Sequence, residues 1–329
     1  MKLAIVILNW NGKALLEQFL PGVISHSPEA DVYVIDNAST DDSVSYLKQH
    51  FPDTKVIINS ENGGYAKGYN EGLKQIDADI FCLLNNDIAV SENWLHPILK
   101  TFKNEPKTAI IQPKILDFKN PDYFEYAGAA GGFIDKYGYP YCRGRIFDTL
   151  EQDLQQYNNT TDIFWASGAC FFIRAKVFNQ LEGFDTHFFA HMEEIDLCWR
   201  AKHLNNAITY LPDSKVYHVG GATLSASNPQ KTYLNFRNSL FMLVKNTPKP
   251  ILPLIIARLL LDGLAGIHFL IQFKPKHILS ILKAHFHFYL ALPLLLKQRK
   301  ATPKTKTYYT VKSIVWQYFV KNNRKFSQL

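Results

Sequence analysis

The chain has 329 residues, of which 47% are hydrophobic and 20% are charged. This composition is typical of a globular protein with a substantial core, and it excludes an intrinsically disordered chain. The net charge of +7 hides an asymmetry, because the residues from 231 onward contain 17 lysines and arginines and a single acid, Asp262. The tail therefore carries a charge of +16 and the preceding residues −9, so we expect the two parts to meet different partners.

The first hundred residues alternate between strand and helix patterns. Strands are expected at residues 3–8, 31–35, 55–58 and 80–84, and helices at residues 13–24, 42–49 and 62–72. This order predicts an α/β protein with a doubly wound sheet and right-handed crossovers. The N-terminal apolar run is too short for a signal peptide, and Cys82 and Cys170 lie in apolar runs where reduced core cysteines are expected. These features favour a cytosolic location.

Polar residues follow each expected strand, namely Asn9, Asp36, Asn62 with Gly63 and Gly64, and Asn86 with Asp87. In open α/β sheets ligands bind beyond the carboxyl ends of the strands, so these residues predict a nucleotide site. A carboxylate at Asp36 could accept the imide N–H of a pyrimidine, and the glycines would let the backbone approach a diphosphate. Asp87 could bind a divalent cation, although the Asn-Asn-Asp run could instead cap the next helix. The glycine motifs of NAD enzymes and of P-loop ATPases are absent.

Three segments, residues 34–41, 62–70 and 84–87, resemble the family 2 glycosyltransferases, most closely their rhamnosyltransferase-like branch. The resemblance implies a GT-A fold and an inverting transfer from a nucleotide sugar. By that likeness Asp36 reads uracil or thymine, and Asp87 holds Mn²⁺ or Mg²⁺ on the diphosphate. The residues expected to border the donor are Asn9, Asn62, Gly64, Lys67 and Asn86. The chain has asparagine at the first two positions of the family's D-x-D motif, so the site retains one acid.

A second acidic motif spans residues 191–200 and resembles the family's E-D-x-D-L-C-W-R pattern, with Glu194 in place of the usual aspartate. By that likeness Glu194 is the general base for the acceptor hydroxyl, and Glu193 is its rival. A structural account is also open, because Asp196 and Arg200 are spaced as a helical ion pair and acids are favoured at a helix N-terminus. We expect Asp196 on the acceptor side.

Further strands and site residues are expected around this motif. Residues 108–161 are expected to give only short strand-like pieces, and strand-like runs follow at residues 207–211 and 215–218. Trp165 is assigned to the acceptor wall, and Arg237, on a helix that resembles the one beneath the family's acceptor site, to a phosphate contact. A lone histidine is more often a packed residue than a ligand. His218, however, ends a strand-like run, precedes Gly220 and Gly221, and stands where related enzymes complete the cation site with histidine. Neutral imidazole binds Mn²⁺, and Mg²⁺ less readily.

The basic tail contains two apolar stretches, residues 251–273 and 277–292. The first is long enough to span a bilayer, but Arg258 and Asp262 fall on one arc of its helical wheel. Amphipathic helices with basic flanks fit a membrane surface better than a span, the alternative being core packing or an oligomer contact. Nucleic acid is not expected as a partner, because the tail has no recognisable motif and the acidic front would oppose binding.

These observations predict a GT-A domain at residues 1–228 and a helical membrane-associating tail at residues 229–329. The expected reaction moves a sugar from a UDP- or dTDP-sugar to a hydroxyl of a glycan, with polyprenyl diphosphate as its expected carrier, at the cytoplasmic face of the membrane. Two alternatives are a catalytically inactive nucleotide-sugar-binding scaffold and a sugar-1-phosphate nucleotidyltransferase. The second would need a glycine-rich basic loop after the first strand, which Asn9 to Gly12 does not provide.

Overall fold

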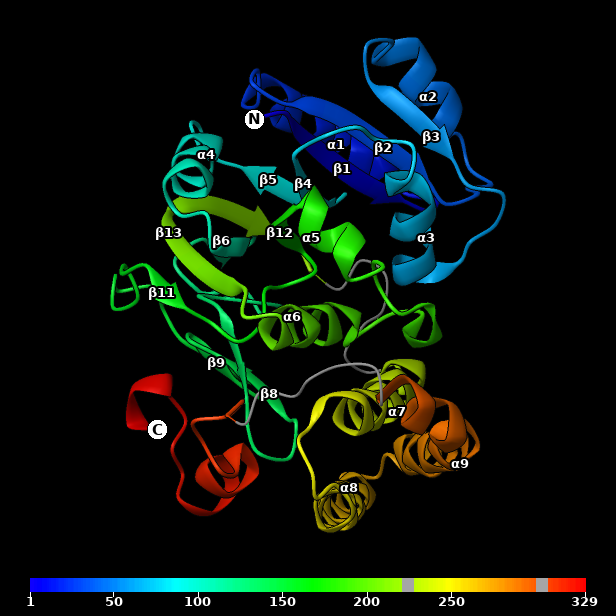
Figure 1. Ribbon diagram of the computed structural model, residues 1–329, viewed down its shortest axis with the longest axis vertical. Coiled ribbons are helices and arrows are strands. Elements are labelled where there is room, and N and C mark those ends of the chain that lie inside the picture. The colour runs from blue at the N-terminus through cyan, green and yellow to red at the C-terminus, as the bar shows by residue number, and fades with distance from the viewer. Residues whose placement is uncertain (221–227, 300–306) are drawn as a thin grey trace.

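A computed structural model of the chain describes residues 1–220, 228–299 and 307–329 (Figure 1). Gly221, the second glycine after His218, lies outside the described residues. The main sheet has the strand order β11-β13-β6-β12-β4-β1-β2-β3, with β5 paired to β13. Its strands are β1 Leu3–Asn9, β2 Asp31–Asp36, β3 Lys55–Ile58, β4 Ile80–Asn85, β5 Ile88–Val90, β6 Thr108–Asp117, β11 Thr161–Asp162, β12 Cys170–Arg174 and β13 Ala207–His218.

Helices join these strands and extend the chain beyond them. They are α1 Lys13–Ser25, α2 Ser43–His50, α3 Gly64–Leu73, α4 Leu95–Asn104, α5 Ala175–Gln180, α6 Glu193–His203, α7 Pro229–Asn246, α8 Leu252–Ile271 and α9 Pro275–Arg299. A smaller sheet contains β7 Gly132–Ile134, β8 Pro140–Cys142, β9 Arg145–Ile146 and β10 Thr149–Leu150. Short helical turns occur at Thr186–Phe188, Trp316–Val320 and Phe326–Gln328.

The parallel half of the main sheet confirms the predicted doubly wound arrangement. Strand β1 pairs in parallel with β2 on one side and with β4 on the other, so Ile7 lies opposite both Val34 and Leu84. Strand β12 then pairs antiparallel with β4 and β6, which makes the sheet mixed. Apolar residues fill β1 and β4 on both faces, as expected of strands covered by helices on two sides. The four cysteines are free and buried.

Two parts of the sheet differ from the prediction. Residues 108–161 were expected to give only short strand-like pieces, but β6 is a ten-residue strand that lies beside β13. The two strand-like runs at 207–211 and 215–218 form one strand, β13, with a register shift between Leu211 and Lys215. A shift of this kind lets one strand bend without ending, so a polar interruption in sequence need not mark a turn.

Helix α7 packs into the same core as the main sheet, although the predicted boundary at residue 228 places it in the tail. Buried residues of α7 such as Leu240 and Leu243 belong to the same apolar cluster as Phe171 of β12. The Lys245 ammonium also lies 2.9 Å from the Asp196 carboxylate of α6. Residues 307–329 return to the small sheet, where Tyr318 hydrogen-bonds to Thr149. The predicted boundary therefore does not separate two independent cores.

Helices α8 and α9 lie together on the side of α7 remote from the main sheet (Figure 1). Both are long and apolar enough to cross a membrane. In α8 the polar residues face inward, because Arg258 and Asp262 are buried and the Arg258 Nη1 donates to the Tyr137 carbonyl. Large apolar side chains face outward instead, among them Leu252, Ile256, Leu260, Leu264 and Ile267. The helix is therefore apolar on the face that the protein leaves uncovered.

Candidate active site

The carboxyl ends of β1, β2 and β4 meet at one edge of the sheet, as predicted. Asn9 ends β1 and donates from Nδ2 to Asp36 Oδ1, 3.3 Å away at the end of β2. Asn86, just after β4, donates to Asn9 Oδ1 over 3.0 Å. All three side chains come from neighbouring strands in register, so sheet pairing alone brings them together. These three hydrogen-bonded side chains form a polar floor at this edge of the sheet.

Asp87 and His218 come together at the same edge because β5 pairs with β13. In that ladder His218 lies opposite Ile88, the residue after Asp87. The Asp87 Oδ1 and His218 Nε2 atoms are 3.1 Å apart, and both side chains are buried. The predicted pair of cation ligands therefore lies side by side, although the two residues are far apart in the sequence.

Glu125, which the sequence analysis missed, lies on the other side of His218. Its Oε2 is 3.2 Å from His218 Nδ1, close enough for an ion pair although too poorly aligned for a hydrogen bond. Burial alone would lower the pKa of His218, but the Asp87 and Glu125 carboxylates outweigh it and raise that pKa to about 10. This arrangement of two carboxylates around one imidazole strongly favours positive charge at His218.

Glu193 and Glu194 are the first two residues of α6. Burial, together with the charge of Glu194, raises the pKa of Glu193 well above its ordinary value. Burial raises the pKa of Glu194 to about 7. The buried Oε2 atom of each has no hydrogen-bond partner within the described part of the chain. Unpartnered carboxyl oxygens with a pKa near neutrality are the properties of a general base.

The acid behind His218, Glu125, and the acid at the start of α6, Glu194, both affect the pKa of Cys142. Burial raises the pKa of this thiol, and the charges of both Glu125 and Glu194 raise it further. Cys142 thus lies within the field of the acid behind His218 and of the acid on α6. The described residues thus offer a pair that could hold a cation and an acid that could accept a proton, the groups that a glycosyl transfer needs.

The model of the family described as glycosyl transferase family 2 matches residues 4–182, more than half of the chain. The chain belongs to glycosyltransferase family 2. It is 25% identical over 235 residues to the N-acetylglucosaminyl-diphospho-decaprenol L-rhamnosyltransferase of Mycobacterium tuberculosis, a match that covers 66% of this chain and 75% of the relative. The family assignment excludes the nucleotidyltransferase alternative and makes the protein a nucleotide-sugar-dependent transferase.

Solved structures of other glycosyltransferases share the GT-A fold. A crystal structure of GalNAc-T7 with UDP, GalNAc and Mn²⁺ superposes with a TM-score of 0.60 at 17% identity, and it covers 76% of this chain and 48% of that one. TarS residues 1–349 of S. aureus, in complex with UDP-GlcNAc, superposes with a TM-score of 0.55 at 15% identity over 91% of this chain and 84% of that one. At these identities the likeness establishes the fold of this glycosyltransferase.

The donor atoms of Asp87 and His218 fit a divalent cation. They are one carboxylate and one imidazole at a strand edge, and Glu125 lies behind the imidazole as in carboxylate–histidine–metal triads. The flanking carboxylates favour positive charge there, whether a proton or a metal ion carries it. Residues 1–220, 228–299 and 307–329 contain no group of three or more His, Cys, Asp or Glu side chains arranged for a metal ion. A cation at this pair would therefore need oxygens from the donor diphosphate.

At the N-terminus of α3, the free backbone N–H groups already donate to a carbonyl of the protein, that of Phe189. Gly64 has φ +75°, and a Cβ there would lie 2.5 Å from the Phe189 carbonyl oxygen. That carbonyl accepts the Tyr65 N–H over 2.9 Å. Asn62 Oδ1 accepts from Gly64 N at 3.0 Å, while Lys67 pairs with Glu61 at the surface. In this structure Asn62, Gly64 and Lys67 thus shape the loop, and their predicted contact with the donor remains a proposal.

The segment before Glu193 is strained and held by α7. Phe189, His191 and Met192 have φ values of +64°, +69° and +73°, a left-handed backbone that such side chains rarely adopt. The Asn238 Nδ2 donates to the carbonyls of Phe188, Ala190 and His191 at 2.7–2.9 Å. Conformations of this cost persist only where neighbours enforce them, so Asn238 positions the loop that delivers Glu193 and Glu194.

Three residues predicted for the acceptor side have structural roles. Asp196 is fully buried and accepts from Arg200 Nε at 2.8 Å, from Lys245 and from Asn246, so the structural alternative for this residue is correct. Trp165 is 2% exposed and donates to the Phe133 carbonyl over 2.9 Å. Arg237 uses its Nη2 on the carbonyls of His187 and Phe188 rather than on a phosphate. Sequence motifs identify such residues as part of a site without showing which way each side chain points.

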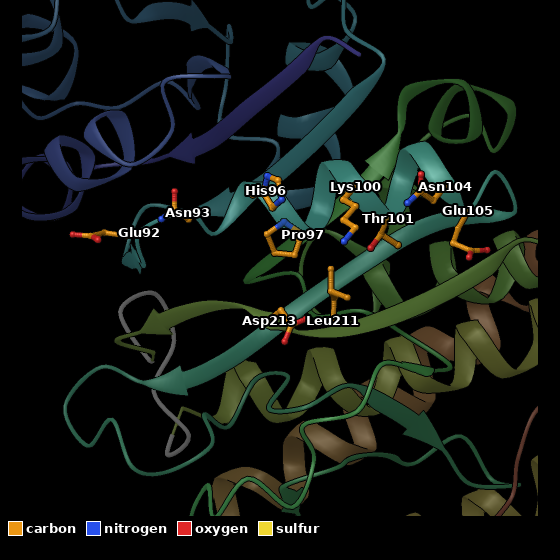
Figure 2. A pocket seen from close by; sticks show the side chains of 10 residues that line it. All are labelled: Glu92, Asn93, His96, Pro97, Lys100, Thr101, Asn104, Glu105, Leu211 and Asp213. Carbon is orange, nitrogen blue, oxygen red and sulfur yellow. The ribbon is translucent and has the colours of Figure 1, made fainter.

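A surface cavity of about 720 Å³ lies elsewhere, between α4 and the bend of β13 (Figure 2). Its lining includes Glu92, His96, Lys100, Glu105 and Asp213. None of the residues predicted for catalysis or donor binding lines it. The cavity therefore has no part in the site at the strand ends.

Proposed function

We propose that this glycosyltransferase moves a sugar from a UDP- or dTDP-sugar to a hydroxyl group of a glycan carried on polyprenyl diphosphate, at the cytoplasmic face of a membrane. The observation that carries the proposal is the Asp87–His218 pair at the strand ends, together with the buried Glu194 Oε2, which has no hydrogen-bond partner among the described residues. The relative from Mycobacterium tuberculosis, whose name specifies a diphospho-decaprenol substrate, supports a lipid-linked acceptor. The outward apolar faces of α8 and α9 support membrane contact.

The donor would lie along the strand ends. Asp36 lies at the edge of the polar floor, where its carboxylate can accept the N3–H of uracil or thymine. Asp87 and His218 would hold Mn²⁺ or Mg²⁺ against the diphosphate, with Glu125 orienting the imidazole. Such a cation, when bound, neutralises charge that develops on the leaving diphosphate. Asn9 and Asn86 hydrogen-bond to each other in the polar floor and so hold Asp36 in position.

The transfer would be a single displacement with inversion. Glu194 accepts the proton of the acceptor hydroxyl as the oxygen of that hydroxyl bonds to the anomeric carbon. The bond between that carbon and the diphosphate oxygen breaks on the opposite face, and its electron pair leaves with the nucleoside diphosphate. The pKa of Glu194, about 7, suits a base that works near neutral pH. Glu193 beside it is the alternative base.

A donor panel tests this function. UDP- and dTDP-sugars are incubated with Mn²⁺ and a prenyl-diphosphate-linked N-acetylglucosamine, and nucleoside diphosphate release is followed for the wild type and for Glu194→Gln. We expect at least one uridine or thymidine donor to be turned over by the wild type, with an inverted glycosidic product. Absence of turnover and of slow donor hydrolysis with every donor would leave only the inactive-scaffold alternative.

A further inference from the structure

Arg145 of β9 is a buried cation that forms no ion pair with a carboxylate in the described part of the chain. Its side chain is 6% exposed, and its Nε has no hydrogen-bond partner in the described part of the chain. The Nη2 donates to Cys142 Sγ at 3.3 Å, a weak acceptor for a guanidinium. A buried guanidinium with an unused donor is unfavourable unless an anion can approach it.

Lys231 places a second cation beside Arg145. The Arg145 Cζ lies 4.7 Å and the Lys231 Nζ 5.7 Å from the centre of the Tyr126 ring, which is partly exposed. Burial and the charge of Arg145 lower the pKa of Lys231, although Glu125 opposes this effect. The pair thus meets at an exposed ring, and the described residues include no carboxylate within ion-pair distance of either cation.

Arg145 is connected to the residues around His218 through Cys142 and Glu125. Cys142, which accepts from Arg145, feels the charges of Glu125 and Glu194. Glu125 faces His218 from the side opposite Asp87. Arg145 thus contacts Cys142, and Glu125, the acid behind His218, lies near enough to this thiol to affect its pKa.

Helix α7 connects this position to the membrane-facing helices. Lys231 is in the first turn of α7, where the helix dipole favours an anion. The next residues of α7 bind α9, because Thr232 hydrogen-bonds to His277 and Tyr233 to His287. The outer face of α9 exposes Leu279, Leu282, Phe286 and Leu290. The first turn of α7 therefore lies against α9, the helix that exposes these apolar side chains.

We propose that Arg145 and Lys231, beside Tyr126, form a phosphate-binding subsite for the diphosphate of the lipid-linked acceptor. This inference rests on the proposed function and names the feature by which the enzyme recognises its acceptor carrier. Arg145 offers a planar fork that matches phosphate oxygens, and Lys231 adds a point charge at the helix N-terminus. The sugar of the acceptor is then directed towards Glu194.

Binding of geranyl diphosphate to the full-length protein in EDTA tests the subsite, with geraniol as the uncharged control. EDTA removes the cation on which the donor diphosphate depends. We expect geranyl diphosphate to bind without metal and geraniol to bind far more weakly. Lys231→Gln and Arg145→Gln should each weaken geranyl diphosphate about tenfold or more, because each removes charge-assisted hydrogen bonds. Lys48→Gln, on the exposed face of α2, is the charge-matched control and should bind as the wild type does.

The two diphosphate sources are separated by titrating UDP with Mn²⁺ into the same proteins. If Lys231→Gln weakens UDP and leaves geranyl diphosphate unchanged, the donor diphosphate uses these cations and the acceptor subsite is wrong. Equal binding of geranyl diphosphate and geraniol, or unchanged geranyl diphosphate binding in the variants, also overturns it. Lys231 is only half-buried, so its variant stays informative if Arg145→Gln fails to fold. Failure of UDP and dTDP to bind the wild type would contradict the proposed function instead.

Discussion

At the scale of single residues, the adjacent acids Glu193 and Glu194 are expected to have different roles in the reaction. Glu193 is 4% exposed and Glu194 is half-buried, so Glu194 is the more accessible to a substrate. Two carboxylates this close cannot both ionise easily, which keeps one of them protonated near neutral pH. The burial difference favours Glu194 as the base and Glu193 as its uncharged neighbour.

Substitution of each acid separates these roles. Glu194→Gln keeps the size and polarity of the side chain but removes proton acceptance, so turnover should fall by roughly 10²–10⁴-fold while UDP or dTDP affinity survives. Glu193→Gln should cost far less, because it replaces a largely protonated acid by an amide. Steady-state kinetics with titrations of the nucleotide measure both effects. A large loss in Glu193→Gln together with near-normal Glu194→Gln would reverse the assignment.

The pH dependence of turnover follows from the burial of Glu194. Burial disfavours the ionised form and raises the pKa to about 7, so the base is increasingly protonated, and inactive, as the pH falls below that value. The turnover number should therefore rise with pH between about 6 and 8 and then level off. A profile that is flat over this interval, or one that falls, would show that the ionisation of Glu194 does not limit the reaction.

Base recognition by Asp36 predicts a selective thermal shift. The carboxylate offers only acceptors, which suit the N3–H of uracil or thymine and repel the ring nitrogens of adenine. UDP and dTDP with Mn²⁺ should therefore raise the melting temperature more than ADP or GDP does, because a ligand that binds only the folded state stabilises it. Asp36→Asn should reduce this selectivity. Equal shifts from all four nucleotides would exclude a role for Asp36 in base choice.

The residues at the strand ends were predictable from sequence, and those on the connecting loops were not. Asn9, Asp36 and Asp87 follow apolar strands whose carboxyl ends must share one edge, so pattern and topology together locate them. Glu125 sits in a loop among aromatic residues, and nothing nearby in the sequence marks its partner, His218. The one feature of the sequence that could have indicated a role for Glu125 is its position between two aromatic residues, Phe124 and Tyr126.

At the scale of elements, α7 acts as a clamp on the loop before α6. The three carbonyls that Asn238 binds belong to the segment with left-handed residues, so the helix holds a conformation that the loop would not keep alone. The sequence placed this helix in the tail because its composition is basic. Its neighbour on α6, Asp196, is buried and accepts hydrogen bonds from Lys245 and Asn246 of α7, and only the tertiary structure shows that contact.

Removal of the clamp should affect catalysis more than donor binding. Asn238→Ala deletes three hydrogen bonds to the loop and leaves Asp36, Asp87 and His218 in place, so the turnover number should fall about tenfold or more while the UDP dissociation constant stays unchanged. Asn235→Ala, half-buried on the same helix, is the matched control. If Asn238→Ala changed neither quantity, the loop would keep its position without the helix.

At the scale of the whole molecule, the buried ion pair of α8 faces the protein, and several of the helix's large apolar side chains are exposed. The sequence predicted the amphipathic pattern correctly but could not tell which face meets the protein. The Arg258 Nε lies 2.7 Å from Asp262 Oδ1, and Asp262 also accepts from the Tyr139 hydroxyl. This buried network attaches the helix to the residues around the small sheet and leaves the apolar face uncovered, which is the face proposed to contact the bilayer.

Charged substitutions on that face test the membrane assignment. Leu260 and Leu264 are 68% and 61% exposed, and replacing both by glutamate should move the protein from the membrane to the soluble fraction at moderate salt. Leu154→Glu alters a leucine that is 72% exposed beside the small sheet and should leave the fractionation unchanged. High salt should release the wild type only in part, because salt screens the basic residues and not the apolar contact. A wild-type protein that is fully soluble at low salt without detergent would contradict the assignment.

The measurement that tests the central claim most directly is a calorimetric titration of UDP and dTDP into the wild type and Asp87→Asn, with Mn²⁺ and with EDTA. Asp87 is the carboxylate that faces His218 Nε2, and the substitution keeps its shape while it removes the charge. The account predicts that one or both nucleotides bind the wild type only when Mn²⁺ is present, and that Asp87→Asn loses this binding. Equal affinity in EDTA and in Mn²⁺, or full metal-dependent affinity in Asp87→Asn, would contradict it.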